Sequence, residues 1–553
     1  MMIRVLTAGV LVTLLSVGRC ARQEAHITLS VVPQRFEVKI GPNRGDAIAW
    51  GSFDNRITDT GFGYLEIYTS QVFPSQYQAY AAGILEGYLT RTLISMHYNN
   101  TMRDYCKGQT YYCLKLYVFL QKNLDYINRN IKQYREKEPY WFQTELALIQ
   151  LSGIQDAWSA VEGERYSPHF DGYTHITPLL FLNVDGDLED LEQALRSPKL
   201  RRVHGGGHCS ALVKMLSDNS DLLVSHVTWN DYSGMLRILK KYSLNYTQVF
   251  FGGVSDRQIP GSTMTFSSSP GRIFSGDDYH LISSGLVSME TTIGNSNPAL
   301  WSKITPKCNL EWLRTIVANR LATTGDEWSR YFQRERSGSY NNQWMIVDYK
   351  KFAPGQPIQP GTLTVLEEIP GMVKFADQSS VLNNQGYWPS YNIPFYKEIY
   401  DASGWEESVK RFGDWFTYDR HPRANIFRRD HVKVKDIDSM MKLMRYNDFY
   451  HDEFSKCNCS PPYSAENAIS ARNDLNLPNG TYPFMALAHR SHGGTDAKVT
   501  NINLFKNLEF LSVCGPTYDP LPPFQWSKSG LNNLHEGQPD LWTFKPHVHH
   551  WSK

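Results

Sequence analysis

The sequence lacks an excess of charge of either sign and has no cluster of basic residues. Its 553 residues carry 56 Lys and Arg against 55 Asp and Glu, so the formal net charge is +1. Proteins that bind a nucleic-acid backbone usually carry a concentrated basic patch or stripe. The charge pattern therefore predicts no nucleic-acid partner.

Long apolar runs are absent after the first residues. Residues 5–17 are mostly apolar and follow Arg4, which is the pattern of a secretory signal peptide cut near residues 18–21. No later run is long enough to span a bilayer. We therefore expect a signal peptide over residues 1–21. We also expect a mature chain without a transmembrane segment, either lumenal or secreted.

No Pro-, Ser- or Gly-rich linker and no internal repeat divides the chain. The length alone allows several domains. The 41% hydrophobic and 13% aromatic content is typical of a protein with a large core. Without a place to cut the chain, we interpret residues 22–553 as one large fold.

Cysteine is scarce, and its count is informative. Of eight cysteines, Cys20 is expected to leave with the signal peptide, and the odd number that remains leaves at least one free thiol in an oxidising compartment. Cys106 and Cys113 close a short loop and are natural disulfide partners. Cys457 and Cys459 could pair only in a strained Cys-x-Cys loop. We predict both disulfides.

Four N-x-Ser/Thr sequons agree with passage through the secretory pathway. Sequons of this kind accept N-linked glycans when they lie at the surface. The predicted glycosylation sites are Asn99, Asn245, Asn458 and Asn479.

The most informative segment is Val203–Leu212, in which three glycines precede His208 and Cys209. Glycine gives the backbone access to conformations that other residues avoid, and strain of this kind occurs at reactive sites. A cysteine freed by cleavage of the peptide bond ahead of it would carry its own α-amine, so one residue would supply nucleophile and base. We predict a self-processing precursor, cut between His208 and Cys209 into fragments 22–208 and 209–553.

Three other interpretations of Cys209 remain. It could be a buried apolar residue or half of a disulfide. His204, His208 and Cys209 could bind zinc, but His-x3-His ligation needs a helix that three glycines disfavour. Residues 207–211 also look like a nucleophile elbow with Cys for Ser, yet residues 199–203 are too basic for the buried strand that an elbow requires. We predict no metal and no cofactor.

Hydrophobic periodicity places helices mainly before Cys209 and strands mainly after it. The predicted helices are 76–97, 114–137, 141–162, 188–195, 235–242 and 310–332. The predicted strands are 47–53, 63–69, 178–184, 210–216, 221–229, 272–274, 279–283, 285–292 and 344–349. This order suits an α+β fold, a four-layer αββα sandwich in which helices cover both outer faces of two packed sheets.

Several separated motifs resemble the phospholipase B-like family. They are Gly207–Leu212, Thr228-Trp229, Met235–Ile238, Phe274–Asp278, Leu286–Asn295, Tyr340–Trp344, Tyr387–Asn392, Ile426–Asp430 and Ser491–Gly494. The resemblance runs from about Ala47 to Trp542. It implies the amino-terminal nucleophile hydrolase fold, the lysosome lumen, and a precursor that is split before Cys209.

The resemblance also implies a set of pocket residues. They are Cys209, His226, Trp229, Thr292, Asn392 and Arg423. Asn392 would donate its amide to a developing oxyanion, or it could be a turn-capping residue. Arg423 would bind an acyl carboxylate or a phosphate, or it could be solvated.

The other three residues have equally plain alternatives. His226 would orient the α-amine or tune the thiolate, but a lone His in a strand is also common in cores. Thr292 would donate a hydrogen bond to the amine, or it could be an ordinary strand residue. Trp229 would shape an apolar wall for the substrate, and a core Trp would look the same.

The resulting hypothesis is a lysosomal, self-cleaved cysteine hydrolase that removes acyl groups from lipids. Its partners would be a small lipid or amide substrate and the two precursor fragments, associated noncovalently, with a homodimer as one assembly. An amidase is the alternative within the enzymes, and a binding glycoprotein with a vestigial site is the alternative outside them. The intact set of Cys209, Asn392 and Arg423 favours an enzyme.

Overall fold

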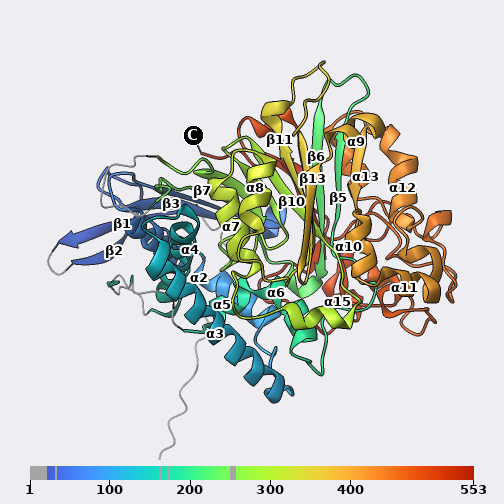
Figure 1. The fold of residues 1–553 in the computed structure, drawn as a ribbon, viewed down its shortest axis with the longest axis horizontal. Helices are drawn as coiled ribbons and strands as arrows, with labels where there is room; N and C mark the ends of the chain where they lie inside the picture. The colour runs from blue at the N-terminus through green and yellow to red at the C-terminus, as the bar shows by residue number, and fades with distance from the viewer. Residues whose placement is uncertain are drawn as a thin grey trace, which may run out of the picture.

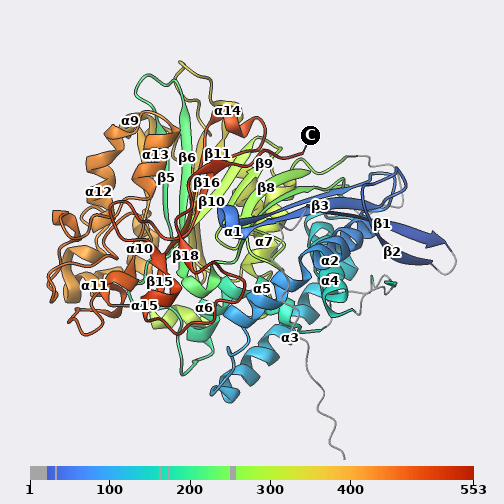
Figure 2. The same ribbon diagram turned by 180° about the vertical axis from the view of Figure 1, so that it is seen from behind.

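The computed structural model describes a chain built around two large β-sheets. The described residues are 22–31, 34–160, 165–167, 170, 173, 175–249 and 257–552. The predicted signal peptide, residues 1–21, lies outside them. Figures 1 and 2 show the long strands of both sheets at the centre of the molecule, with helices on either side.

The larger sheet has eleven strands within the described residues. In spatial order they are β13 (Met372–Asp377), β12 (Leu363–Ile369), β11 (Asn342–Asp348), β10 (Leu286–Thr292), β9 (Tyr279–Ile282), β8 (Thr263–Ser268), β7 (Arg237–Ser243), β4 (Phe62–Thr69), β3 (Ala49–Arg56), β1 (Gln23–Val31) and β2 (Gln34–Ile40). Neighbouring strands are antiparallel except for β4 and β7, which run parallel. That parallel pair joins the strands before Cys209 to those after it.

Within the same described ranges, the smaller sheet has six strands, and Cys209 lies at the end of one of them. In order they are β14 (Tyr387–Ser390), β5 (Ser210–Met215), β6 (Leu222–Asp231), β15 (His492–Thr500), β16 (Leu511–Cys514) and β19 (His547–Val548). All five pairings are antiparallel. Because β5 begins at Ser210, Cys209 lies just before the first residue of this inner strand, where the chain enters the sheet.

The two sheets pack face to face through alternating side chains. Ala211 and Val213 of β5 share one buried cluster with Val287 and Met289 of β10. The intervening Leu212 belongs to a different cluster, on the opposite face of the smaller sheet. Successive strand residues point to opposite faces, so strands covered on both sides are apolar throughout.

Helices from the first half of the chain, with two later ones, cover the outer face of the larger sheet, and their buried residues form one cluster with it. They are α2 (Ser75–Thr101), α3 (Thr110–Tyr134), α4 (Pro139–Ser159), α5 (Pro178–Asn183), α6 (Asp185–Ala194), α7 (Glu311–Leu321) and α8 (Gly325–Phe332). Figure 1 shows α2, α3 and α4 gathered beside the extended β1–β2 hairpin.

Later helices lie on the outer side of the smaller sheet, at the right of Figure 1. They are α9 (Ser379–Gln385), α10 (Lys397–Ala402), α11 (Trp405–Phe412), α12 (Pro422–Asp430) and α13 (Ile437–Met444). Ile426 of α12 and Met440 of α13 pack with Leu212 of β5 and Val227 of β6. Short elements complete the chain: α1 (Ile57–Thr60), α14 (Ile502–Phe505), α15 (Trp526–Ser529), β17 (Phe524–Gln525) and β18 (Leu541–Trp542).

Most predicted elements before residue 349 are confirmed, but four predictions are wrong. Residues 178–184, predicted as a strand, contain helix α5, because Pro178 suits a first helical turn and the Thr177 hydroxyl accepts a hydrogen bond from Leu180 N. Residues 310–332, predicted as one helix, are α7 and α8. Thr324 caps a new helix there by accepting from Glu327 N.

Residues 235–242, predicted as a helix, contain strand β7. The charged residues Arg237 and Lys240 broke the apolar pattern expected of a buried strand. They are buried here because each forms an ion pair. Lys240 Nζ lies 2.6 Å from Glu86 Oε1, and Arg237 Nε lies 2.9 Å from Asp496 Oδ2. Residues 272–274, predicted as a strand, form a bent turn segment between β8 and β9.

Both predicted disulfides are confirmed: Cys106 pairs with Cys113 and Cys457 with Cys459. Three described cysteines, Cys209, Cys308 and Cys514, are free and buried. No helix in the described parts of the chain has the length and apolar content to cross a membrane.

Candidate functional site

An irregular arm carries the chain from α6 to Cys209, and its glycines are needed where it lies closest to other groups. Gly205 has φ +75°. A Cβ on Gly207 would come 2.7 Å from the Trp229 ring and 3.1 Å from Arg423 Nη2. Only a residue without a side chain fits there, so the glycine run lets the backbone pass beneath Trp229 and Arg423.

Cys209 has a backbone conformation that is rare for its residue type. Its φ is +81°, in the left-handed region, and its side chain is buried. A non-glycine residue held in this region costs on the order of 1–3 kcal/mol and persists only where the surroundings enforce it. The peptide bond ahead of Cys209 is therefore part of a constrained segment.

Asn392 bonds to both backbone polar groups of His208, the residue directly ahead of Cys209. Its Nδ2 donates to the His208 carbonyl oxygen at 2.5 Å and to the Thr292 carbonyl oxygen at 2.7 Å. Its Oδ1 accepts from His208 N at 3.2 Å. Asn392 itself has φ +72°, which asparagine tolerates better than most residues. The carbonyl that precedes Cys209 therefore faces a fixed amide donor.

Arg423 fixes Asn392 and the start of β5 together. Its Nη2 donates to Asn392 Oδ1 at 2.7 Å, and its Nη1 donates to the Cys209 carbonyl oxygen at 2.7 Å and to Ser210 Oγ at 3.1 Å. The guanidinium also lies 4.4 Å from the centre of the Trp229 ring. Burial lowers the pKa of Arg423 to about 10, so the group remains a cation at neutral and acidic pH.

His226 and Thr292 belong to strands beside Cys209. In the described residues, neither side chain forms a hydrogen bond with the Cys209 thiol. His226 Nε2 lies 2.9 Å from the Glu290 carbonyl oxygen, and burial lowers the pKa of His226 to about 3. The ring is therefore neutral. The Thr292 hydroxyl is buried and has no hydrogen-bond partner among the residues that the structure describes, while the Thr292 carbonyl accepts from Asn392.

The Cys209 thiol is un-ionised in the continuous chain. Burial raises its pKa well above the usual range, and the nearby Glu290 carboxyl raises it further. The Trp229 backbone amide acts in the opposite direction. A neutral thiol is a poor nucleophile, so a proton must leave it before or during any attack.

A buried ion network beside the site was missed by sequence reasoning. Asp277 Oδ2 lies 2.6 Å from Arg237 Nη2 and 2.9 Å from Lys498 Nζ, and it accepts from Thr228 Oγ1 at 2.7 Å. Lys498 also pairs with Asp496 at 2.5 Å. Arg237 lies in β7, Asp496 and Lys498 lie two residues apart in β15, and Asp277 lies in the connection between β8 and β9, so no local pattern links them. The network lines the cavity wall at Asp277 and Thr228.

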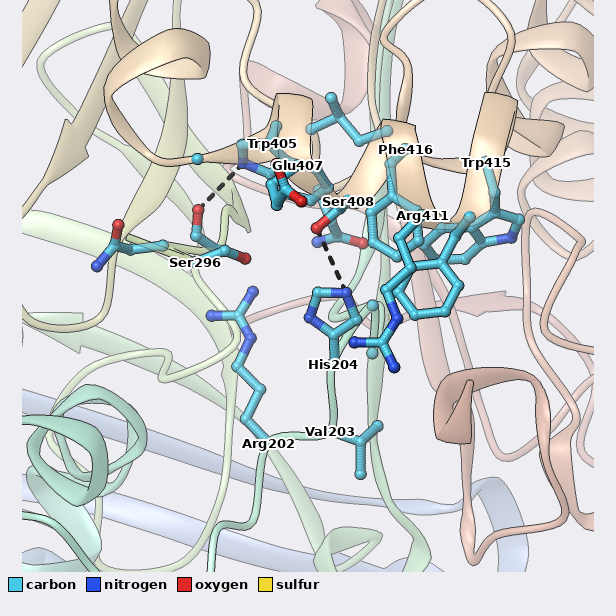
Figure 3. A pocket seen from close by; sticks show the side chains of 18 of the residues that line it. Arg202, Val203, His204, Ser296, Trp405, Glu407, Ser408, Arg411, Trp415 and Phe416 are labelled. Carbon is cyan, nitrogen blue, oxygen red and sulfur yellow. Dashed lines mark hydrogen bonds between the residues drawn. The ribbon is translucent and has the colours of Figure 1, made fainter. Parts of the chain in front are cut away.

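Two cavities flank the arm. One, of about 400 Å³, is lined by Cys209, His208 and Trp229. The other, of about 430 Å³, is lined by Asn392 and Arg423. Val203 lines both, so the arm separates the thiol side from the amide side. Figure 3 shows the second cavity, with the arm residues Arg202, Val203 and His204 along one edge.

The alternative interpretations of Cys209 can be compared with this geometry. The arm over residues 195–208 contains no strand, which is unlike the strand-to-helix turn of a nucleophile elbow. In the described part of the chain, no three His, Cys, Asp or Glu side chains are arranged to hold a metal ion.

The predicted glycosylation sites differ in exposure. Asn458 and Asn479 are exposed, and Asn458 lies between the two cysteines of a disulfide. Asn99 Nδ2 donates to Glu536 Oε2 at 3.0 Å, and Asn245 Nδ2 donates to the Thr69 carbonyl oxygen at 2.5 Å. All four stay predictions, and the last two amides have protein partners.

Comparison with known proteins gives one consistent answer. The family model described as Phospholipase B matches residues 49–549. The chain is 51% identical over 513 residues to "Putative phospholipase B-like 2" of Rattus norvegicus, covering 91% of this chain and 86% of that protein. The human protein of the same name is 50% identical over 91% of this chain and 85% of its own length. "Phospholipase B-like protein B" of Dictyostelium discoideum is 36% identical over 94% of this chain and 89% of its own length.

Proposed function

The chain belongs to the phospholipase B-like family, and from this premise we propose that it is a self-processed cysteine hydrolase that removes acyl groups from lipids in the lysosome lumen. The proposal includes the four-layer fold of the amino-terminal nucleophile hydrolases. Two packed sheets with helices outside each of them support it. The signal peptide pattern, the two disulfides and the sequons support a lumenal location.

One observation carries the mechanism: Asn392 Nδ2 donates to the carbonyl oxygen directly ahead of Cys209, at 2.5 Å. Attack on that carbonyl would place negative charge on its oxygen. A fixed donor aimed at such an oxygen is the usual means of stabilising a tetrahedral intermediate. A buried Asn used only as a turn cap would have no need to hold the peptide bond of a strained cysteine.

The processing step balances without a cofactor. Cys209 Sγ bonds to the His208 carbonyl carbon, and the thiol proton moves to the Cys209 nitrogen as the C–N bond breaks. The product is a thioester with a free α-amine. Water then hydrolyses the thioester, which leaves a carboxylate on His208 and restores the thiol.

The mature enzyme would repeat this chemistry on an external acyl bond. The substrate carbonyl would take the place of the His208 carbonyl beside Asn392. Sγ would form a thioester with the acyl group while the alcohol leaves with a proton, and water would release the fatty acid. Arg423 would hold Asn392 in place throughout, since both ends of its guanidinium are already bonded.

The new α-amine would change the state of the thiol. An ordinary α-amine has a pKa of about 7.7–8.0, so it is protonated in an acidic lumen. An ammonium group beside Sγ favours the thiolate, which offsets the burial that now keeps the thiol neutral. The resting mature site would then be an ammonium–thiolate pair, with a proton donor ready for the leaving group.

An amidase is the second candidate, and it too has an observation in its favour. The bond that lies in the site of the continuous chain is itself an amide, between His208 and Cys209. A site able to cleave that bond would also accept N-acyl amines. The two candidates share every residue role and differ only in the leaving group.

The test uses purified precursor, free of other proteases and held at acidic pH. Sequencing of the second fragment should give Cys-Ser-Ala-Leu at its amino terminus. The mature protein is then incubated with a lysosomal lipid and amide extract, and mass spectrometry identifies what disappears. A fully active protein that stays one chain contradicts self-processing. A cleaved protein that consumes nothing supports a binding glycoprotein instead.

A further inference from the structure

The cavity on the Asn392 side of the arm has an aromatic wall. Trp405 and Phe412 of α11, with Trp415 and Phe416 just after it, form this wall. Phe416 is central: its ring centre lies 5.7 Å from that of Trp405, 5.6 Å from that of Phe412 and 4.9 Å from that of Trp415. Large rigid rings of this kind provide apolar contact area for a ligand.

Two arginines from different segments face the same cavity. Arg202 comes from the arm and Arg411 from α11, and in Figure 3 they lie on either side of the His204 ring. His204 stacks on Phe416, with ring centres 5.1 Å apart. Burial lowers the pKa of His204, and Arg411 and Arg202 lower it further, so both guanidinium groups act on this one ring.

Neither arginine forms an ion pair with a carboxylate in the described parts of the chain, although Arg202 acts electrostatically on the buried Asp190 and Glu189 carboxyls. Among the described residues, Arg202 Nη1 has only a long bond to the Ile293 carbonyl oxygen, at 3.4 Å. Two carboxyl groups share the cavity. Glu407 lies 3.5 Å from Lys410, and burial raises the pKa of Asp190 to about 7, so Asp190 is neutral in an acidic lumen. The cavity therefore has excess positive charge at acidic pH.

We infer that this cavity binds a phosphate-bearing amphiphile, with the phosphate at Arg202 and Arg411 and the apolar chain along Trp405, Phe412, Trp415 and Phe416. Guanidinium groups are well suited to phosphate, and the rings match an acyl or alkyl chain. Asn392 and Arg423 line the same cavity, so an acyl carbonyl of this ligand would face the amide donor once the His208 carbonyl has left it. The assignment of the ligand as a substrate rests on the proposed function, whereas the binding does not.

The test measures binding separately from turnover. The full-length Cys209→Ala chain keeps the arm in place and cannot process itself. Octyl phosphate, octyl glucoside and inorganic phosphate are titrated at acidic pH, with tryptophan fluorescence and calorimetry as readouts. We expect octyl phosphate to bind at least about tenfold more tightly than either of the others, because only it satisfies the arginines and the aromatic wall together.

The arginine variants decide which groups hold the phosphate. Arg411→Gln and Arg202→Gln should each weaken octyl phosphate binding about tenfold and leave octyl glucoside unaffected. Arg420→Gln is the matched control: Arg420 is exposed, pairs with Asp414 at 2.9 Å and does not line the cavity. Its affinity should be unchanged, and the thermal melting of all three variants verifies their folding.

Three results would overturn the inference. They are equal affinities for octyl phosphate and octyl glucoside, equal affinities for octyl phosphate and inorganic phosphate, and full octyl phosphate affinity in either Arg411→Gln or Arg202→Gln. A failure of the proposed function looks different. In that case octyl phosphate still binds through Arg411, but the wild-type chain neither cleaves itself nor consumes lipid.

Discussion

Cys209 and Cys308 are two free, buried cysteines in the same protein with very different surroundings. Both have thiols whose pKa is raised chiefly by burial. Only Cys209 has a positive φ. Asn123 Nδ2 donates to the Pro306 and Cys308 carbonyl oxygens, at 3.0 and 2.8 Å. Neither of these is the carbonyl of the peptide bond directly ahead of Cys308. Asn392 donates to the carbonyl directly ahead of Cys209.

Burial and the position of the cysteine in the fold have different effects. Burial makes both thiols neutral and unreactive. Of these two cysteines, only Cys209 has the strained backbone and the amide donor on which the proposed reaction at the preceding peptide bond rests. A Cys308 Sγ bonded to the Thr305 carbonyl oxygen at 3.2 Å fits a packing role.

The largest difference in processing should be seen when each of these two cysteines is replaced with alanine in turn. Cys209→Ala should abolish cleavage at the 208–209 bond, since no nucleophile remains, while Cys308→Ala should be processed normally. Electrophoresis of the purified chains under acidic conditions measures both. We expect Cys209→Ser to be processed, because a hydroxyl can perform the same acyl shift. Normal self-cleavage of the alanine variant at position 209 would exclude autocatalysis.

The second test removes the amide donor and keeps the shape. Asn392→Asp retains Oδ1 for Arg423 and His208 N but lacks the group that faces the carbonyl, so processing at neutral pH should slow about 100- to 1000-fold. Asn447→Asp is the control, because Asn447 Nδ2 also holds two backbone carbonyls, those of Ala465 and Ser470. If the two variants are processed at equal rates, Asn392 is only structural.

The third test concerns the pH dependence of thiol reactivity. In the uncut chain the pKa of Cys209 is raised, so its alkylation should be negligible at acidic and neutral pH and should increase only above the ordinary thiol value of about 8.5. In the mature chain the neighbouring ammonium group should keep alkylation measurable well below that value. Cys308 is the internal baseline. Equal alkylation of Cys209 in the mature chain and in an uncut Asn392→Asp chain would show that the new amine does not activate it.

The smallest effect concerns the helix that leads into the arm. Burial raises the folded-state pKa of Asp190 to about 7, above its unfolded value of about 3.9, so its contribution to stability is full below the unfolded value and is lost as pH rises through about 7. Asp190→Asn mimics the protonated form and should be more stable than wild type above about pH 7, by on the order of 1–4 kcal/mol. Urea unfolding at several pH values measures this. Identical pH profiles for the two chains would show that Asp190 does not titrate on unfolding.

Local pattern predicted the strands around Cys209 well. Residues 210–216 and 221–229 are short apolar runs, and both became neighbouring strands of the smaller sheet. The same rule failed at 178–184, where an apolar run is a buried helix. It failed in the opposite direction at 235–242, where buried Arg237 and Lys240 break the apolar pattern of a strand. Periodicity reports burial only when the buried groups are apolar.

The site could be predicted only in part. The glycine run indicated Cys209, and family resemblance brought in Asn392 and Arg423. The resemblance could not show that Asn392, 184 residues further along the chain, lies on the His208 carbonyl. Nor does any local pattern encode the positive φ of Cys209, a residue that leads directly into β5 and whose carbonyl is bonded to the distant Arg423. The disulfides needed only local spacing, and both were predicted correctly.

The contacts of Arg423 would keep the downstream part of the site assembled after the proposed cleavage. Its four bonds run to Cys209, Ser210, Tyr391 and Asn392, all downstream of the cut. The upstream end has none of these bonds and is held by Asn392 through His208 N and the His208 carbonyl oxygen. Its release would break those two bonds and would leave every Arg423 contact in place. Once the released end has diffused away, the cleaved amide bond could not re-form. The space that the His208 carbonyl leaves beside Asn392 would then be free for the carbonyl of each later substrate.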